Sequence, residues 1–491
     1  MKPQTVSETR FLSNFIDGQW VKGDGDATES LNPADGSVVA RFTAATSEQL
    51  STMIDVSVKA QNAWDNVGII QRGLILRQAA QIMSERAEEL AELMTAEQGK
   101  VLGDSRAEVG ATIETLYYHA GCARSANGST YPSSVPDELI RTIRRPLGTV
   151  GVVTPWNFPL QIAAWKIAPA LLWGNTVVWK PSSETPAIAV EFVKILAQAG
   201  VIPGAINLLL GSGRLGGTMV ADPRVAGVTF TGSVRVGHII RDAVIPRGAK
   251  LQMELGGHNP TIVLPDADME LAADSIVAAS MGSTGQKCTA TRRIITVGEA
   301  YDALAPQIAK RVEALSVGQG DADDSQIGPV ISRKARVEID DAIALAVSEG
   351  AQVLAKAGIP DEDGAYATPT LLTGSRDLTI CREEVFGPVT TILKVDSLQD
   401  AVELANDTEY GLTASLFTSD ERSVRYFLTH VEAGLVKVNA PSTGSEVHGP
   451  FGGLKNSTYP GPREQNGDSS ADFFTQTKTA YIRLAPEKDS R

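Results

Sequence analysis

The hydrophobic residues between positions 148 and 254 gather into four short, nearly continuous runs, each followed by a stretch with helical periodicity. The runs are Val150–Val153, Thr176–Trp179, Ala205–Leu210 and Val225–Phe230. Strands that are apolar on both faces and alternate with helices indicate a parallel sheet covered on both sides. This segment therefore predicts an α/β nucleotide-binding architecture, with ligands beyond the carboxyl ends of the strands.

The flanking segments show other patterns. Residues 15–42 contain short apolar runs joined by Asp-Gly turns, which predicts an N-terminal hairpin, and residues 47–121 show the three- and four-residue spacing of helices. A second α/β region is expected over residues 255–434. The alternation in Leu139–Arg144 predicts an exposed strand, and the C-terminal Thr479–Leu484 predicts another, paired with it or with another subunit.

Composition narrows the class of protein. The chain has 491 residues, of which 43% are hydrophobic and 21% charged, which is typical of a soluble globular protein with two or three structural units. A formal net charge of −14 argues against binding to nucleic acid or to an anionic membrane. No apolar run approaches the ~18 residues of a membrane span, and Met1–Arg10 lacks the apolar core of a secretory leader. We therefore expect a cytoplasmic protein.

Cysteine and histidine usage bears on redox chemistry and metals. The three cysteines are widely spaced, so the sequence does not predict a disulfide framework. The five histidines are scattered, without a pair at metal-ligand spacing. We expect no metal site.

Three residues are candidates for covalent chemistry. Cys288 lies among small and polar residues in Gly285–Thr291, although an isolated thiol is more often core filler than a nucleophile. Asn157 lies in a Pro-bounded turn after the first apolar run, where its amide would suit an oxyanion donor, and an ordinary turn is the commoner interpretation. Glu254 lies in an apolar run, where burial would suit it as a general base; an exposed strand end is the alternative.

Two glycine-containing turns are candidates for binding phosphate. Gly211–Gly216 matches the pattern GxGxxG, but it is not the first strand-to-helix turn of its domain and lacks the acidic residue expected downstream. A tight packing turn is an equally good interpretation. Phe230–Ser233 ends a strand before a helix, so its N–H groups would suit a pyrophosphate.

Seven motifs stand in the order typical of the aldehyde dehydrogenase superfamily, and the chain resembles that superfamily over nearly its whole length. The motifs are Pro-Trp-Asn157-Phe-Pro, Lys180-Pro-Ser-Ser-Glu-Thr-Pro, Phe230-Thr-Gly-Ser, Glu254-Leu-Gly-Gly, Gly285-Gln-Lys-Cys288, Glu384-Val-Phe386-Gly-Pro and Pro450-Phe-Gly-Gly-Leu-Lys455. A chance match of all seven is negligible. The resemblance turns Cys288 from core filler into the expected nucleophile.

The resemblance implies an α/β fold in three parts. A Rossmann-type NAD(P)-binding domain would span residues 1–126 and 147–255, and an α/β catalytic domain residues 256–440. A small β oligomerisation extension would comprise residues 127–146 and 471–491 and would pair across subunits of a homodimer or homotetramer.

The resemblance also implies a mechanism. Cys288 attacks the aldehyde as a thiolate, and the Asn157 amide with the Cys288 backbone N–H stabilises the oxyanion. After hydride transfer to the nicotinamide, Glu254 activates the water that hydrolyses the thioester. Lys180, counted with this catalytic group, would hold the adenosine ribose. Cys288 should therefore lie where two domains meet, within reach of the Asn157 amide.

Further residues are implied in binding the cofactor, with Glu384 and Phe386 at the nicotinamide ribose and ring. The others are Thr154, Pro155, Trp156, Ser182, Ser183, Gly213, Gly217, Phe230, Gly232, Ser233, Val236 and Leu255. NAD-preferring relatives often carry Glu three residues after the motif lysine, where this chain has Ser183 and places its acid at Glu184. Because that change removes repulsion of a 2′-phosphate, we expect use of NADP or of both cofactors.

The substrate is expected to be a small semialdehyde. The segments around Trp165 and after Val438 resemble those of bacterial 2-oxoglutarate semialdehyde (2,5-dioxopentanoate) dehydrogenases, although Pro460 and Asn466 depart from the pattern. Succinate semialdehyde or another acidic or aromatic aldehyde is the alternative, and a catalytically silent cofactor-binding or structural protein is the non-enzyme alternative. Candidate substrate contacts are Gln161, Lys287, Arg292 and Phe451.

Overall fold

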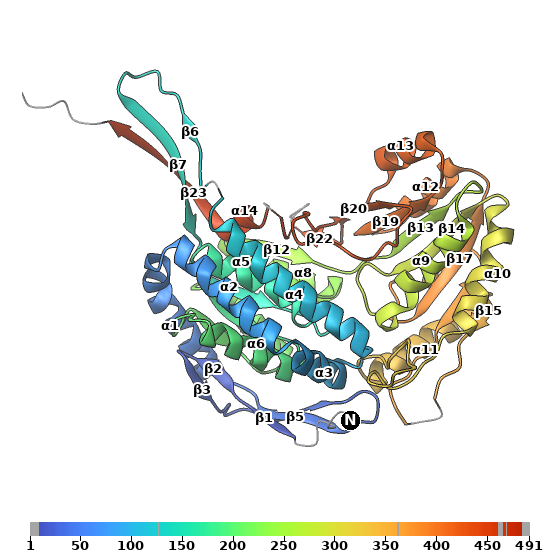
Figure 1. The fold of residues 1–491 in the computed structure, drawn as a ribbon, viewed down its shortest axis with the longest axis horizontal. Helices are drawn as coiled ribbons and strands as arrows, with labels where there is room; N and C mark the ends of the chain where they lie inside the picture. The colour runs from blue at the N-terminus through green and yellow to red at the C-terminus, as the bar shows by residue number, and fades with distance from the viewer. Residues whose placement is uncertain (1–8, 126, 361–362, 460–464, 468, 484–491) are drawn as a thin grey trace, which may run out of the picture.

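The computed structural model describes residues 9–125, 127–360, 363–459, 465–467 and 469–483. Two large sheets, each covered by helices, form two lobes that lie side by side, and a narrow arm projects from the first lobe (Figure 1). This arrangement confirms the predicted α/β fold class. No helix within the described ranges is long and apolar enough to cross a membrane.

The sheet of the first lobe has eight strands, of which the central five are parallel. In spatial order they are β22 (Thr458–Tyr459), β12 (Lys250–Glu254), β11 (Gly227–Thr231), β8 (Thr149–Val153), β9 (Thr176–Lys180), β10 (Ile206–Leu208), β2 (Asn14–Ile16) and β3 (Gln19–Val21). The four strands expected between residues 148 and 254 are present, and the N-terminal hairpin is β2 with β3. Because strand order reverses between β8 and β11, the loops after these two strands flank the crevice where such sheets bind ligands.

Nine helices of the described chain cover or extend this lobe. They are α1 (Ser47–Asn66), α2 (Ile69–Glu85), α3 (Ala87–Gln98), α4 (Leu102–Cys122), α5 (Gln161–Leu172), α6 (Pro186–Gln198), α7 (Gly213–Ala221), α8 (Val234–Val244) with the short turn η1 (Ile245–Arg247), and α14 (Ser470–Phe474).

Buried Glu97, near the end of α3, fixes the start of α6. It accepts hydrogen bonds from the N–H groups of Ala187 at 2.8 Å and Ile188 at 3.0 Å, and burial raises its pKa to about 7. It thus anchors the helix that follows the Lys180 motif.

The second lobe contains a seven-stranded sheet that is parallel except for the first strand in its order. The strands are β15 (Gln352–Lys356), β16 (Thr370–Thr373), β17 (Val389–Val395), β14 (Thr291–Val297), β13 (Asn259–Val263), β19 (Thr413–Phe417) and β20 (Leu435–Val438). Its other elements are α9 (Met269–Met281), η2 (Gly282–Gly285), α10 (Ala300–Glu313), α11 (Arg333–Ser348), η3 (Thr379–Cys381), α12 (Leu398–Asn406), α13 (Glu421–His430) and the pair β18 (Tyr410–Gly411) with β21 (Leu454–Lys455). Residues 255–258 join β12 directly to β13, so the two sheets share one short connection.

The arm consists of β6 (Thr130–Tyr131), β7 (Glu138–Pro146) and β23 (Thr475–Arg483). β23 pairs antiparallel with β7 along its whole length, so the C-terminal strand is satisfied within the chain on that edge. α14, which precedes β23, buries Phe473 and Phe474 in the core of the first lobe. A separate small sheet near the N-terminus comprises β1 (Arg10–Leu12), β4 (Ala27–Leu31) and β5 (Val38–Thr43).

Candidate active site

The chain enters Cys288 from a left-handed turn. Ser283, Thr284 and Gly285 have φ angles of 52°, 58° and 65°. A side chain on Gly285 would overlap the carbonyl oxygen of Gly387, so only glycine fits there. Left-handed backbone is costly for the other two residues, so the surrounding structure must hold the turn in place.

Arg292, at the start of β14, holds this turn from one side. Its Nη1 donates to the carbonyl of Gly387 at 2.7 Å and its Nη2 to the carbonyl of Gly285 at 2.6 Å. Burial lowers the pKa of Arg292 to about 10, and the charge of Glu384 opposes that shift. The guanidinium thus faces backbone carbonyls of the cysteine loop, although the sequence suggested it as a substrate contact.

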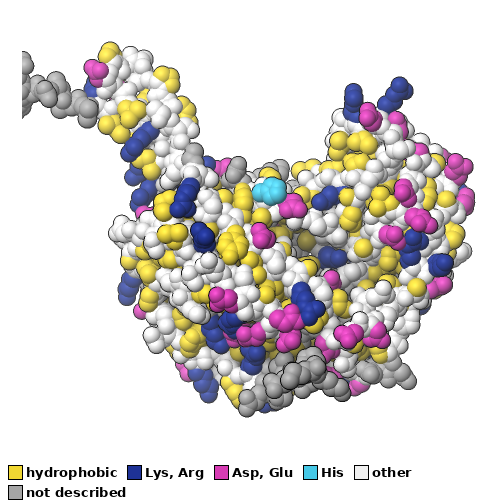
Figure 2. All heavy atoms as spheres, in the orientation of Figure 1, with side chains coloured by type: hydrophobic (Ala, Val, Ile, Leu, Met, Phe, Trp, Pro, Cys, Tyr) yellow, Lys and Arg dark blue, Asp and Glu magenta, His cyan; other side chains and the backbone are white. Residues whose placement is uncertain are grey.

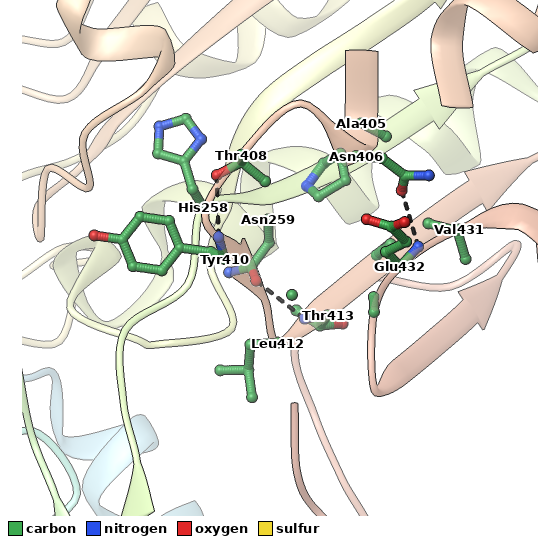
Figure 3. Close-up of a pocket in the computed structure, with 14 residues that line it drawn as sticks. His258, Asn259, Ala405, Asn406, Thr408, Tyr410, Leu412, Thr413, Val431 and Glu432 are labelled. Carbon is green, nitrogen blue, oxygen red and sulfur yellow. Dashed lines mark hydrogen bonds between the residues drawn. The ribbon is translucent and has the colours of Figure 1, made fainter. Parts of the chain in front are cut away.

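Asn259, the first residue of β13, holds the loop from the other side. Its Nδ2 donates to the carbonyls of Cys288 at 2.7 Å and Ala290 at 2.8 Å. Its Oδ1 accepts from the N–H of Thr413 at 3.1 Å, as Figure 3 shows beside a small cavity. The amide therefore ties the cysteine backbone to the start of β19.

The Cys288 side chain packs in a small apolar cluster built from both lobes. Its neighbours are Phe158, Ile162 and Trp165 from the loop after β8 and from α5, and Leu412, Leu435 and Phe451 from the second lobe and the C-terminal segment. The Trp165 and Phe451 rings are 4.9 Å apart. The thiol lies where the two lobes meet, which is the position that the sequence predicts for it.

Two carboxylates shape the electrostatics at the thiol. Burial, and then the negative charges of Glu384 and Glu254, raise the pKa of Cys288 to about 12. Glu254, buried at the end of β12, accepts from the Thr458 hydroxyl at 3.0 Å. Glu384 accepts from the Gly257 N–H at 3.1 Å, and burial raises its pKa. In this state the thiol is neutral near pH 7, so attack requires a proton acceptor.

The Asn157 amide contacts the cysteine loop directly. Its Nδ2 donates to the carbonyl of Gln286 at 3.0 Å, two residues before Cys288. Its own backbone carbonyl accepts from Lys100 Nζ at 2.6 Å. The side chain is buried in the loop after β8, the strand that pairs with β11.

A buried lysine that sequence reasoning did not single out lies near Glu254. Lys166, on α5, donates from Nζ to Thr229 Oγ1 at 3.0 Å and to Gln465 Oε1 at 2.7 Å. Burial lowers its pKa to about 7, and the charge of Glu254 opposes that shift. A lone lysine inside an otherwise apolar helical run was the available signal.

The Lys180 side chain lies at the end of β9, inside the first lobe. Its Nζ donates to the carbonyl of Pro181 at 2.8 Å, and burial lowers its pKa to about 8. A Cβ on Gly216 would lie 2.8 Å from its Cδ, so glycine allows α7 to approach the lysine. Ser183 Oγ donates to the carbonyl of Gly211 at 3.0 Å. The lysine motif and the GxGxxG turn are therefore adjacent.

The remaining expected cofactor residues of the first lobe lie at or just after the carboxyl ends of β8, β9, β11 and β12, or on α7 and α8. Ser233 caps α8 by accepting from the Val236 N–H at 3.4 Å, and the Gly232 N–H donates to the Glu254 carbonyl at 3.1 Å. A Cβ on Gly213 or on Gly217 would meet no atom within 4 Å.

Further contacts join the rest of this set. The hydroxyl of Thr154 accepts a hydrogen bond from Trp179, and the backbone N–H of Glu184 donates to Ser182 Oγ. Leu255 packs against Gly237, and Phe230 packs against Gly232. The ring of Trp156, which follows Pro155, meets the Phe386 ring edge to face at a centroid distance of 5.6 Å. Glycine-lined space beside a buried ammonium and two helix starts fits a dinucleotide.

The other substrate candidates are spread out. Phe451 packs in the Cys288 cluster. Lys287 Nζ donates to the carbonyl of Ala278 at 3.4 Å, and burial lowers its pKa to about 8. Gln161 begins α5, and its N–H donates to Glu108 at 3.2 Å. Of this group, Phe451 is the residue that the structure packs against the thiol cluster.

Of the two residues in the C-terminal loop that depart from the semialdehyde dehydrogenase pattern, the structure describes Asn466. Pro460 lies outside the described residues. Asn466 is buried with a φ of 61°, and its side-chain amide has no hydrogen-bond partner in the described part of the chain. The same described residues contain no group of three His, Cys, Asp or Glu side chains able to hold a metal ion.

Comparison with known proteins decides the family. The pattern of the aldehyde dehydrogenase family matches residues 20–480. The chain belongs to the aldehyde dehydrogenase family. Family membership confirms the predicted fold and the prediction of an NAD(P)-dependent enzyme that oxidises aldehydes.

Several members of the family are similar over their whole length. The chain is 39% identical to the alpha-ketoglutaric semialdehyde dehydrogenase of Bacillus subtilis, over 97% of this chain and 99% of that one. It is 37% identical to the 2,5-dioxopentanoate dehydrogenase of Saccharolobus solfataricus, over 94% and 98%. A crystal structure of betaine aldehyde dehydrogenase from Staphylococcus aureus in complex with NAD+ superposes with a TM-score of 0.93 at 31% identity, over 97% and 95%.

Proposed function

We propose that this enzyme oxidises 2-oxoglutarate semialdehyde to 2-oxoglutarate through a thioester on Cys288. Support for the substrate comes from the full-length similarity to semialdehyde dehydrogenases from a bacterium and an archaeon, at 39% and 37% identity. Support for the covalent route comes from the Asn157 amide, which lies against the Gln286 carbonyl beside a thiol packed between the lobes.

In the proposed reaction, Cys288 gives its proton to the Glu254 carboxylate, which passes it to solvent, and the sulfur forms a bond to the aldehyde carbon. The Asn157 amide and the Cys288 N–H donate to the oxygen that becomes negative, and both are neutral donors that leave the thiolate reactive. A bound nicotinamide nucleotide supplies the hydride acceptor. Glu254 then takes a proton from water, whose oxygen attacks the thioester and releases the acid and the Cys288 sulfur.

For the cofactor we propose NADP or dual use. Ser183 occupies the position where a glutamate would repel a 2′-phosphate, and its hydroxyl lies beside the buried Lys180 motif, against Gly211. Steady-state kinetics with both cofactors tests this. A kcat/KM that favours NAD more than about a hundredfold, roughly 2.7 kcal/mol, would contradict it.

We also propose that the arm joins subunits of a homodimer or homotetramer. Figure 2 shows hydrophobic and basic side chains along the arm, and Leu139, Tyr131 and Tyr481 are exposed there. A strand edge with exposed apolar side chains is a ready surface for another chain. Light scattering of the full chain, compared with a Leu139→Lys/Tyr481→Lys variant, tests the assembly.

The three cysteines form no disulfide with one another, which supports a place in the reducing cytoplasm.

The substrate is tested by a kinetic panel. The panel contains 2-oxoglutarate semialdehyde, succinate semialdehyde and an aromatic aldehyde, each with NAD and with NADP. We expect the highest kcat/KM for 2-oxoglutarate semialdehyde. A preference for the aromatic aldehyde would match the Phe158, Trp165 and Phe451 rings around the thiol and would replace the substrate assignment while leaving the family reaction intact.

A further inference from the structure

The turn between α3 and α4 and the first two turns of α4 reach both reacting loops. We call residues 97–108 the α3–α4 junction. It lies in the first lobe, far in sequence from both Asn157 and Cys288. Lys100 and Glu108 are buried and Asp104 is half-buried, and all three side chains make hydrogen bonds to the loops of these two residues.

Asp104 holds the left-handed turn that precedes the nucleophile. Its Oδ2 accepts from both the N–H of Ser283 at 3.1 Å and the Oγ of Ser283 at 2.7 Å. Thr284, the next residue, donates to the carbonyls of Gly328 at 3.2 Å and Pro329 at 3.3 Å. Because left-handed backbone is unfavourable for serine and threonine, these contacts keep the turn in a conformation that it would otherwise leave.

Lys100 and Glu108 hold the loop of the oxyanion donor. The two side chains are fully buried and form an ion pair at 2.6 Å. Lys100 Nζ also donates to the backbone carbonyl of Asn157 at 2.6 Å. Glu108 Oε1 accepts from the N–H groups of Leu160 at 2.9 Å and Gln161 at 3.2 Å, at the start of α5. The pair thus binds the backbone of the Asn157 loop at two points.

We propose that the α3–α4 junction is the positioning element that sets Cys288 against Asn157, with Asp104 fixing the turn of the nucleophile and the Lys100–Glu108 pair fixing the loop of the amide. This inference rests on the proposed function, in which these two residues carry the reaction. Each contact ends on the backbone or the first hydroxyl of a reacting loop. A displacement of about 1 Å between reacting groups is enough to lower a rate a hundredfold.

The first experiment replaces Asp104 and uses a matched control. Asp104→Ala removes the acceptor of Ser283, Asp104→Asn keeps an oxygen that can accept from it, and Glu114→Ala removes an exposed carboxylate from the same helix. Measured with NADP and the best aldehyde of the panel, Asp104→Ala lowers kcat about tenfold or more while KM for NADP changes by less than about twofold. Asp104→Asn restores most of the rate, and Glu114→Ala has wild-type kinetics.

A double-mutant cycle separates positioning from general weakening of the fold. Ser283→Ala removes the hydroxyl that donates to Asp104, so the losses in kcat from Asp104→Ala and Ser283→Ala are less than additive. Additive losses, or an Asp104→Ala variant whose kcat equals that of Glu114→Ala, would overturn the role of Asp104.

The other half of the junction is tested with a charge-neutral pair. Lys100→Met/Glu108→Gln avoids leaving one charge buried alone, and the new amide oxygen can still accept from Leu160 and Gln161. It removes the donor to Asn157, so kcat falls while the rate of Cys288 alkylation by iodoacetamide stays near that of the wild type. An unchanged kcat in a variant with the wild-type melting temperature would contradict the positioning role of the Lys100–Glu108 pair.

The proposed function fails separately. Retention of aldehyde-dependent NADPH production by Cys288→Ala would remove the covalent mechanism, whatever Asp104 does. If aldehyde oxidation requires Cys288 but kcat is unchanged in the junction variants, only the positioning role of the α3–α4 junction is contradicted.

Discussion

The cysteine loop and the glycine-rich turn after β10 are both proposed functional loops, but they are held in different ways. Around Cys288, buried side chains such as Arg292 and Asn259 bind backbone carbonyls, and the turn before it is left-handed. Around Gly213 and Gly217 a Cβ would meet open space. The reacting loop is fixed by buried side chains from distant parts of the sequence, whereas Gly213 and Gly217 of the proposed cofactor turn have no neighbour within reach of a Cβ. Substitutions should therefore be costly at Gly285 and mild at Gly213 and Gly217.

The largest expected effect is at the thiol itself. Cys288→Ala should lower aldehyde-dependent NADPH formation by at least about 10³-fold, because the step that forms the thioester is lost. Cofactor binding, followed by fluorescence titration, should be unchanged because the lysine motif is not altered. A loss of cofactor affinity that matches the loss of rate would show that the two regions are not separable.

The glycines provide the direct comparison. Gly285→Ala should reduce the free energy of unfolding by roughly 1–3 kcal/mol, because φ is positive and the new Cβ overlaps the Gly387 carbonyl. Gly213→Ala, at a site with open space, should change it by less than about 0.5 kcal/mol. Urea unfolding of both variants measures the difference, and equal losses would refute the contrast.

A charged substitution at Ser183 should shift the preference between NADP and NAD by a moderate amount. Ser183→Glu places a negative charge beside the expected 2′-phosphate, so KM for NADP should rise about tenfold and KM for NAD should fall or stay the same. Ser183→Gln, of similar size and no charge, is the control. If both variants raise KM for NADP equally, size rather than charge decides the cofactor.

The smallest effect concerns the charge at the thiol. The negative charge of Glu384 helps to raise the Cys288 pKa to about 12, so Glu384→Gln should lower that pKa and increase the thiolate fraction at any pH below it. Alkylation of Cys288 by iodoacetamide should then be faster at pH 8, and the rising limb of its pH profile should move to lower pH. An unmoved or upward-shifted profile would contradict the electrostatic assignment.

Much of the fold could be predicted because local patterns determine it. The four runs between residues 148 and 254 became parallel strands, and the alternating segments near residues 140 and 480 became the paired strands β7 and β23. Pairing within the chain could not be chosen from the sequence, since an alternating strand fits any partner edge equally well.

Prediction of the site was uneven for a physical reason. Cys288, Asn157 and Glu254 stand in short motifs, so a linear pattern finds them. Asp104, Lys100 and Asn259 act through tertiary hydrogen bonds to backbone atoms, and such bonds leave no pattern along the chain. Arg292 shows the converse: its closeness to the cysteine in sequence suggested a substrate contact, and the fold directs its guanidinium at carbonyls instead.

The short connection between the two sheets has a mechanical consequence. Glu254 ends β12 and Asn259 begins β13, so four residues, two of them glycines, separate the proposed base from the residue that holds the Cys288 carbonyl. A hinge motion that pivots on this connection would move the outer edges of the lobes far and these two residues little. On such a motion, the proposed base and the backbone of the Cys288 loop would keep nearly the same relative position.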